Sequence, residues 1–192
     1  SGIPQTLEQW RQIGSNSLAM ATNGKVFRDD LGEFSHIRQE LRKGYPADVR
    51  KKKLAYYCLL AAHSGQYNLP RIVQRNDNVA AQLTLTEFIH SSLNIIFLLN
   101  NAYAPYYKWI YRSLTELTIL GKELAPLYHT LCISGTWTDK LQLVETICQN
   151  LINELQSQRL STSNSDFLLE HGHSVREQIA DQSLRRMNPW LE

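Results

Sequence analysis

The most apolar stretch of the sequence, residues 79–99, constrains the fold more than any other feature. Polar residues interrupt it between Gln82 and Asn94, so it is too polar to span a membrane and is typical of the central helix of a bundle. Helical periodicity recurs in residues 141–155, and short connections between helices favour antiparallel neighbours. The sequence therefore predicts an all-α fold, an up-and-down helical bundle of about six to eight helices. At most one short β-ribbon is expected, near residues 25–30.

Caps and turn residues divide the chain into segments. Thr6 caps the first predicted helix, Pro46 lies in the first turn of the third, and Thr138 or Asp139 caps the helix that follows residue 133. The predicted helices cover residues 6–22, 33–43, 46–64, 79–100, 106–120, 123–133, 139–159 and 166–187, with a strand-like piece at 25–28. The predicted core includes Leu83, Phe88, Leu93, Phe97, Val144, Ile147 and Leu151.

The length of 192 residues fits one domain with a substantial core. We expect a single helical domain over 1–192, with a linker and first helix in 1–32, a core bundle in 33–160 and a terminal helix in 161–192. The net charge of +2 is too small to indicate nucleic-acid binding, and no membrane partner is expected. The cysteines, Cys58, Cys132 and Cys148, form no CxxC pair, which indicates buried thiols in a reducing, cytoplasmic compartment.

The first candidate binding segment joins a turn at Ser64-Gly65 to an aromatic and amide group and two arginines. Arg71 and Arg75 share one face if the segment is helical, and their guanidinium groups suit phosphate or carboxylate. The alternative is a solvated face with capping or salt-bridging arginines. The nucleotide- or substrate-binding candidates here are Gln66, Tyr67, Asn68, Arg71 and Arg75.

A basic run at residues 50–53 forms a second candidate. It follows Arg38, Arg42 and Lys43, so the local charge is clearly positive and favours an electropositive wall for a phosphate-bearing ligand. The alternative is a solvated helix face, which fits Lys51 and Lys52 better. Lys53 lies closer to the apolar stripe and is the ligand candidate.

A third candidate is the aromatic segment 100–109. Tyrosine and tryptophan supply flat apolar area with a polar tip, which suits a base or a sugar. Tyr107 and Lys108 are the candidates, and Arg112 adds a second cationic group. The alternative is a set of aromatic core residues that close one end of the bundle.

Glu87 is the only candidate general base. It lies inside the apolar stretch, where burial would raise its pKa. We favour the alternative that it pairs with an arginine or lysine. His171 and His173 are a weak metal signal because residues two apart lie on different sides of a helix, so no metal site is expected. No established catalytic motif occurs in the chain.

Five short motifs occur in the order found in a known family. They are residues 24–34 (GKVFRDDLGEF), 45–50 (YPADVR), 64–68 (SGQYN), 97–100 (FLLN) and 107–109 (YKW). Together they resemble the helical carboxy-terminal half of nucleotidyltransferase-like proteins, known as domain of unknown function forty thirty-seven and distantly like kanamycin nucleotidyltransferase. The resemblance covers residues 10–109, and the end of the chain shares the family's helical pattern and its closing Asn-Pro-Trp-Leu, residues 188–191.

The resemblance implies a two-part protein. An amino-terminal nucleotidyltransferase domain, absent from this chain, would hold magnesium and a nucleoside triphosphate. This chain would be its partner, a helical domain that binds nucleotide or a small-molecule acceptor and is not catalytic alone. In that arrangement Tyr67, Asn68, Arg71 and Lys108 would line one cleft facing the missing domain.

Two other classes of function are alternatives to a nucleotide- or acceptor-binding domain. One is a helical protein–protein interaction domain with no small-molecule ligand, which a large exposed apolar patch would favour. The other is a small helical toxin-associated nuclease, whose family carries an arginine four to six residues before a histidine. None of the six histidines of this chain has an arginine at that distance, which argues against the nuclease.

Overall fold

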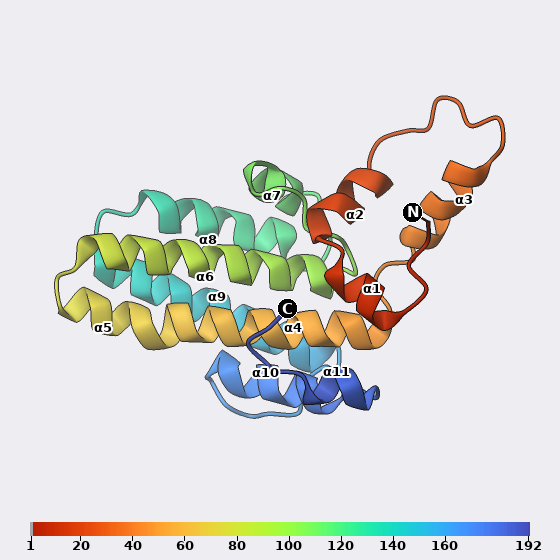
Figure 1. The fold of residues 1–192 in the computed structure, drawn as a ribbon. Helices are drawn as coiled ribbons and strands as arrows, with labels where there is room; N and C mark the ends of the chain where they lie inside the picture. Colours follow the sequence, from red (N-terminus) through yellow and green to blue (C-terminus); the bar gives the residue numbers. More distant parts are fainter. Residues whose placement is uncertain (1) are drawn as a thin grey trace.

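The computed structural model describes residues 2–192, and every regular element within them is a helix (Figure 1). The elements are α1 (Leu7–Gln12), α2 (Ser15–Thr22), α3 (Glu33–Leu41), α4 (Ala47–Ala61), the π-helical segment η1 (Ala62–Asn68), α5 (Leu69–Gln74), α6 (Asn78–Leu99), α7 (Tyr107–Leu114), α8 (Gly121–Ile133), α9 (Trp137–Ser157), α10 (Leu168–Glu177) and α11 (Gln182–Arg186). The all-α prediction is confirmed. The strand-like piece at 25–28 is irregular coil, and no strand forms within the described residues.

The central layer is a long helical rod made of α4, η1 and α5, which lies beside α6 (Figure 1). The chain turns back at the end of α5, where Asn76 has a left-handed backbone with φ of 57°. Asp77 then caps α6 by accepting a hydrogen bond from the backbone N–H of Ala80. α10 packs on α4, α9 packs on α6 and α10, and α8 packs on α9. Neighbouring helices run up and down as predicted.

The third helix does not end near Ser64-Gly65, as the sequence suggested. The chain continues through η1 without a turn, and Gly65 is buried against α6. A Cβ on Gly65 would lie 2.4 Å from Cδ2 of Phe88, so the glycine permits close helix packing and not a change of direction. The wider π-helical turn keeps the rod continuous at this contact.

Six of the seven predicted core residues are buried, and Leu83 is not. Leu83 is 69% exposed because the first turns of α6 place it beside Val79, over a shallow depression that also contacts Trp137. The apolar periodicity of α6 identified the helix correctly, but no neighbouring helix covers this side of its beginning.

Breaks divide the first and last predicted helices, so the structure has more helices than the six to eight expected. Gly14 separates α1 from α2, and it precedes α2 as its N-cap residue. The segment 166–187 forms α10 and α11, which are separated at residues 178–181. Asp48 stabilises this break because its carboxylate accepts hydrogen bonds from the backbone N–H groups of Ala180 (3.2 Å) and Asp181 (2.8 Å).

Two predicted helix ends also moved. The helix expected over 106–120 ends at Leu114, and Leu120 adopts a left-handed conformation with φ of 59° before α8. The helix α9 begins earlier than predicted, because Thr136 is its cap and accepts a hydrogen bond from the backbone N–H of Asp139 (3.1 Å). Neither Thr138 nor Asp139 caps it.

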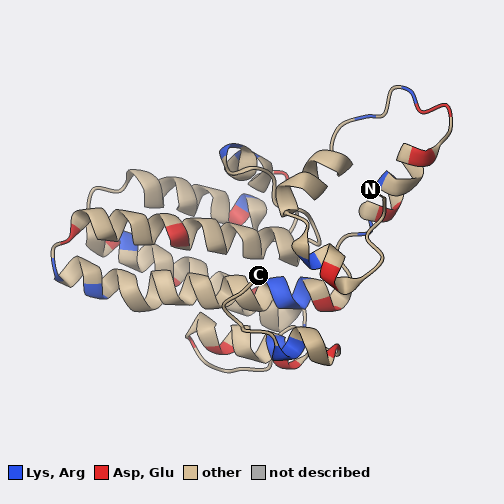
Figure 2. Cartoon of the chain, in the orientation of Figure 1, with Lys and Arg blue, Asp and Glu red and all other residues tan. Residues whose placement is uncertain are grey.

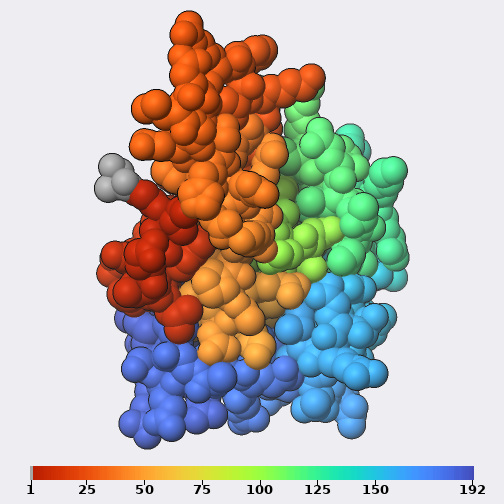
Figure 3. Space-filling model, turned by 90° about the vertical axis from the view of Figure 1, so that its right-hand side faces the viewer, coloured from red at the N-terminus to blue at the C-terminus, as the bar shows by residue number. Residues whose placement is uncertain are grey.

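Residues 23–34 project from the body of the molecule (Figures 1 and 3). Within this projection, Phe27 is 97% exposed and Leu31 is 84% exposed. The projection is anchored by Arg38 of α3, whose guanidinium donates to the backbone carbonyls of Thr22 (2.8 Å) and Asn23 (2.8 Å). This buried arginine caps the end of α2 and fixes the base of the projection.

Two of the three cysteines are buried as expected, namely Cys58 and Cys148, and burial raises the pKa of both thiols. Cys132 is exposed, which corrects the expectation of three buried thiols. None of the helices in residues 2–192 combines the length and the apolar character that crossing a bilayer requires.

Candidate functional site

A groove of about 900 Å³ opens between α2, the end of α3 and α7, and we call it the α2–α7 groove. Its walls combine cationic, aromatic and amide side chains. The residues that matter chemically are Asn23, Arg42, Asn101, Tyr103, Tyr106, Lys108, Trp109, Arg112 and Glu116.

Two asparagines hold the floor of the α2–α7 groove in place. Asn100 ends α6, and its side chain donates to the carbonyls of Ile96 and Ile119 and accepts from the N–H of Ile119. Asn101 has φ of 52° and donates to the carbonyl of Lys43 (3.1 Å). The side chain of Asn101 lies so close to Gly44 that a Cβ there would come within 2.4 Å of it. A glycine at position 44 leaves room for the side chain of Asn101, which explains why these two residues occur together.

An aromatic pair joins the floor of the groove to the core. Tyr103 donates its hydroxyl to the carbonyl of Leu41 (2.6 Å), and its ring meets Tyr45 edge-on at 4.8 Å between centroids. Tyr45 is buried, and burial raises its pKa to about 12, so both tyrosines are neutral near pH 7. The floor is therefore rigid and uncharged beneath the cationic walls.

Three cations and one carboxylate face the α2–α7 groove. Arg42 comes from the end of α3, while Lys108 and Arg112 come from successive turns of α7. Among residues 2–192, neither Lys108 nor Arg112 forms an ion pair, and Glu116 is the one carboxylate that lines the groove. The excess of positive charge favours an anionic ligand.

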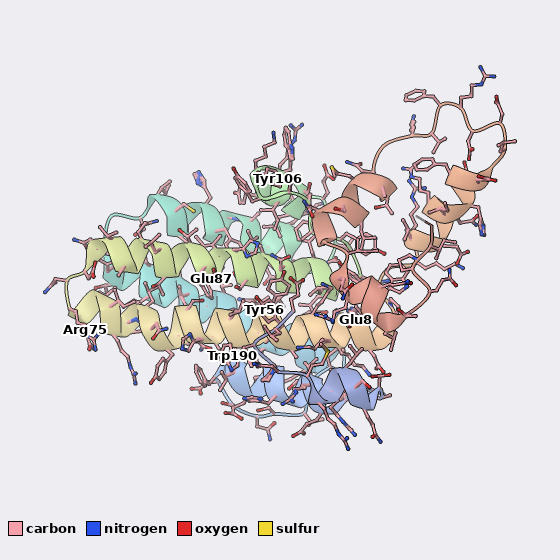
Figure 4. The ribbon with its side chains drawn as sticks, in the orientation of Figure 1. Glu8, Tyr56, Arg75, Glu87, Tyr106 and Trp190 are labelled. Atoms are coloured by element: carbon pink, nitrogen blue, oxygen red, sulfur yellow. The ribbon has the colours of Figure 1, made fainter. Side chains whose placement is uncertain are left out.

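An aromatic platform completes the site. The ring of Trp109 lies 5.4 Å from Nζ of Lys108, and Tyr106 and Tyr107 contact each other with 4.4 Å between ring centroids. Trp109 and Tyr106 line the groove, whereas Tyr107 is 68% exposed beside it. Figure 4 shows Tyr106 at α7, on the upper side of the molecule. Sequence reasoning singled out Lys108 but did not select Arg42 or Trp109, because their convergence depends on tertiary structure.

The second predicted site forms a stack of side chains along η1 and α5. The guanidinium carbon of Arg71 lies 3.6 Å from the ring centroid of Tyr67, which stacks on His63 at 5.8 Å. Trp190 meets His63 edge-on at 5.4 Å between ring centroids, and Asn68 hydrogen-bonds the same histidine (3.2 Å). Tyr67 and Arg71 are exposed, so this stack is a surface feature.

Gln66 has a structural role, because its side chain joins η1 to two other segments of the chain. Its amide donates to Glu145 (2.8 Å) and to the carbonyl of Asp166 (3.1 Å), and it accepts from the N–H of Leu168 (2.9 Å). These bonds fix the start of α10 against η1. Arg75 is exposed at the end of α5, and within the described residues it forms no ion pair.

The predicted shared cleft is wrong. Arg71 lies on α5, before α6 begins, and Lys108 lies on α7, after α6 ends. A helix of 22 residues separates them, or roughly 33 Å at 1.5 Å per residue. Figure 4 shows Arg75 at the left end of the bundle and Tyr106 well away from it, at α7. The candidates Tyr67, Asn68 and Arg71 therefore belong to a different surface from Lys108.

The basic run 50–53 is neither an open wall nor a solvated face. Arg50 donates to the carbonyls of Leu98 (2.6 Å) and Leu99 (3.1 Å), and Lys51 donates to the carbonyl of Gln178 (2.8 Å). Figure 2 shows this run on α4, between α1 and α11.

The last two residues of the run are the most deeply buried. Lys52 and Lys53 are 1% and 2% exposed, and Lys53 pairs with Glu192 at 2.7 Å. These two lysines are buried, contrary to the sequence expectation, because residues far along the chain cover this part of α4. Lys53 is thus already paired in the structure.

Glu87 is exposed and not buried, which corrects the sequence expectation. It lies on the outer side of α6, and its carboxylate accepts a hydrogen bond from Ser91 (3.3 Å). The cationic partner that we favoured is not found among residues 2–192. Its environment offers no burial to support a general base.

The two histidines considered as metal ligands differ in burial. His171 is fully buried, and its two ring nitrogens contact Ser161 (2.8 Å) and the carbonyl of Ser165 (2.8 Å). It fastens the loop before α10. Within residues 2–192, no three His, Cys, Asp or Glu side chains lie together in a way that suits a metal ion.

A protein-family model matches the part of the chain that holds most of these features. The sequence model of the family described as Domain of unknown function (DUF4037) matches residues 10–110. The chain belongs to this family. The match spans half of the chain and includes most of the α2–α7 groove, as well as Tyr67 and Arg71. No curated protein and no solved structure matches the chain.

Proposed function

We propose that this DUF4037 chain is the nucleotide- or acceptor-binding helical domain of a nucleotidyltransferase-like protein and is not catalytic by itself. The observation that carries the proposal is the α2–α7 groove, where Arg42, Lys108 and Arg112 meet an aromatic platform. Phosphate is the anion that such a set of lysine and arginine donors suits best.

Two kinds of side chain on and beside α7 divide the chemistry of the groove. The side chains of Lys108 and Arg112 lie on one helix and supply positive charge to a polyphosphate. Trp109 and Tyr106 supply flat faces against which a base or an aromatic acceptor can stack, and each stacked face contributes about 1–3 kcal/mol. The groove volume of about 900 Å³ is large enough for a nucleotide.

Catalysis is assigned to a separate amino-terminal nucleotidyltransferase domain, which also supplies the magnesium site. This assignment rests on the resemblance of the five motifs. The side chains of the groove support a binding role, because they offer cations and stacking surfaces and a single carboxylate, Glu116. Residues of this kind bind and orient phosphate and leave metal coordination to acidic ligands elsewhere.

Calorimetric titration of ATP into the full chain tests the proposal. Lys108→Ala and Arg112→Ala should each weaken ATP binding by about 1.5–3 kcal/mol. This is the usual contribution of a hydrogen bond to a charged group. Lys122→Ala is the matched control, since Lys122 lies in the first turn of α8 and does not line the groove. Equal affinity in all four proteins, or no binding to any of them, would contradict the proposal.

One observation favours the alternative of a protein–protein interaction domain without a small-molecule ligand. Phe27 and Leu31 project from the family-matched segment 23–34 and are almost fully exposed, and Met20 is 70% exposed near its base. Exposed apolar side chains of this size favour contact with another protein surface. The occupant that we assign is the amino-terminal catalytic domain.

Co-expression with that amino-terminal domain tests the alternative. Phe27→Ser should abolish co-purification, while Lys108→Ala should leave it intact. If nucleotide binding fails and co-purification depends on Phe27, the interaction role replaces the binding role. If Phe27→Ser co-purifies as well as the wild type, the projection has no such role.

A further inference from the structure

Residues 188–192, which we call the strap, cross α4 at the end of the described chain (Figures 1 and 4). The strap buries little apolar surface, since Trp190 is 42% exposed and Leu191 is 56% exposed. Hydrophobic burial therefore does not explain its position. Polar contacts from beneath must hold it.

Two buried lysines make those contacts. Lys52 donates from Nζ to the carbonyl of Asn188 (3.0 Å) and to the carbonyl of Leu191. Lys53 places its Nζ 2.7 Å from Oε1 of Glu192. Both ammonium groups would face solvent if the strap moved away, so the strap completes their burial.

Two further groups converge on Glu192. Tyr57 donates its hydroxyl to the same Oε1 atom at 3.2 Å, and Arg11 of α1 donates to the carbonyl of Glu192. The side-chain carboxylate of Glu192 thus accepts from a lysine and a tyrosine hydroxyl, while an arginine holds the backbone carbonyl of the same residue. This set of donors is typical of a site for an oxyanion.

The charges around this carboxylate do not balance. Arg11 is paired with Glu8, and Lys53 is paired with Glu192. Lys52 contacts carbonyl groups and, among residues 2–192, no carboxylate. Burial, together with the positive charges of Arg11 and Arg176, lowers the pKa of Lys52 to about 8. An additional negative charge would stabilise this buried ammonium.

We propose that Arg11, Lys52, Lys53 and Tyr57 form an oxyanion pocket for the phosphate or carboxylate group of a ligand. Glu192 occupies the pocket in the free protein, and the ligand displaces it together with the strap. The pocket shares no residue with the α2–α7 groove, and the inference does not depend on the proposed function.

The charge balance distinguishes the two oxyanions. A carboxylate replaces Glu192 with an equal charge, whereas phosphate carries more negative charge and offsets Lys52 as well as Lys53. Phosphate is therefore the preferred occupant. The strap lowers the apparent affinity by the fraction of molecules in which the pocket is open. Removal of the Glu192 carboxylate should remove that penalty.

Calorimetry with inorganic phosphate and with acetate, at equal ionic strength, tests the pocket in the full chain. Glu192→Ala should bind phosphate at least about tenfold more tightly than the wild type. The matched control is Glu177→Ala, because Glu177 is exposed on α10 and makes none of the strap contacts described above. Adding Lys53→Met to Glu192→Ala should abolish binding, while adding Lys51→Met should not, since Lys51 contacts Gln178 instead.

The fluorescence of Trp190 gives a second readout in the unaltered protein. Trp190 contacts His63 with 5.4 Å between ring centroids, so displacement of the strap changes its surroundings. Phosphate should change the emission of the wild type and leave that of Trp190→Phe unchanged.

Phosphate bound more tightly than acetate identifies a phosphate ligand, and equal affinities identify a carboxylate ligand. Both results support the pocket. It is overturned if neither anion binds to Glu192→Ala and phosphate leaves the wild-type emission unchanged, or if binding persists after Lys53→Met.

Discussion

Two groups of cationic residues in this protein differ in almost every physical respect. The run 50–53 on α4 looks exposed in the sequence, yet its side chains donate to carbonyls and carboxylates from distant segments. Arg42, Lys108 and Arg112 are scattered in the sequence, yet they line one groove, and Lys108 and Arg112 form no ion pair within residues 2–192. The comparison teaches that the density of charge along a chain does not identify a binding site. Solvent access and the lack of ion pairs in the described part of the chain leave Lys108 and Arg112 open to a ligand, whereas in the oxyanion pocket that we propose Lys52 and Lys53 meet one only after the strap is displaced.

The largest expected effect concerns Arg50. Arg50→Ala removes hydrogen bonds to the carbonyls of Leu98 and Leu99 and to the side chain of Gln158 (2.8 Å). Loss of these charged hydrogen bonds, and of a cation at the end of α6, should lower the free energy of unfolding by about 3 kcal/mol. Urea denaturation monitored by circular dichroism measures it. A loss below about 1 kcal/mol would show that Arg50, like the groove cations, contributes little to the stability of the fold.

A smaller effect is expected from the titration of Lys52. Its pKa is about 8 in the folded protein, against 10.5 for an ordinary lysine. Between these values the unfolded chain binds more protons than the folded one, so the free energy of unfolding rises with pH.

The wild type should therefore gain up to about 2 kcal/mol relative to Lys52→Met between pH 8 and about pH 9.5. Because both proteins carry the same raised tyrosine pKa values, the difference between them isolates Lys52. Denaturation curves at several pH values give this difference. Parallel stability profiles would show that Lys52 titrates like a solvated lysine.

The smallest expected effect is on the stability of the groove variants. Lys108 and Arg112 are exposed, so their replacement by alanine should change the free energy of unfolding by less than about 0.5 kcal/mol. The same urea experiment measures it. A larger loss in either variant would show that the groove cations support the fold and would weaken the contrast with Arg50.

Much of the fold followed from the sequence because periodicity and caps are local signals. The long helix α6 and the buried face of α9 were predicted from such signals. Gly65 was misread as a turn because a glycine that permits close packing against Phe88 looks the same in a sequence. The exposure of Leu83 depends on which helix lies opposite, which periodicity does not specify.

The site was predictable only in part, for a related reason. Lys108 beside Trp109 is a local pattern and was found, although the groove around it was not. Lys53 was expected to meet a ligand and instead meets Glu192, 139 residues away along the chain. Arg71 and Lys108 were predicted to share a cleft because the sequence does not specify near which end of α6 each residue lies. Long-range partners decided all three outcomes.

The most direct test of the account uses the indole N–H signals of the four tryptophans in a nuclear magnetic resonance titration with ATP. Trp109 lies in the α2–α7 groove, and Trp137 lies at the far end of the bundle beside Asn78. The account predicts that ATP shifts the signal of Trp109 and leaves that of Trp137 unchanged. A shift at Trp137, or no shift at Trp109 while ATP binds, would contradict the assignment of the groove as the nucleotide site.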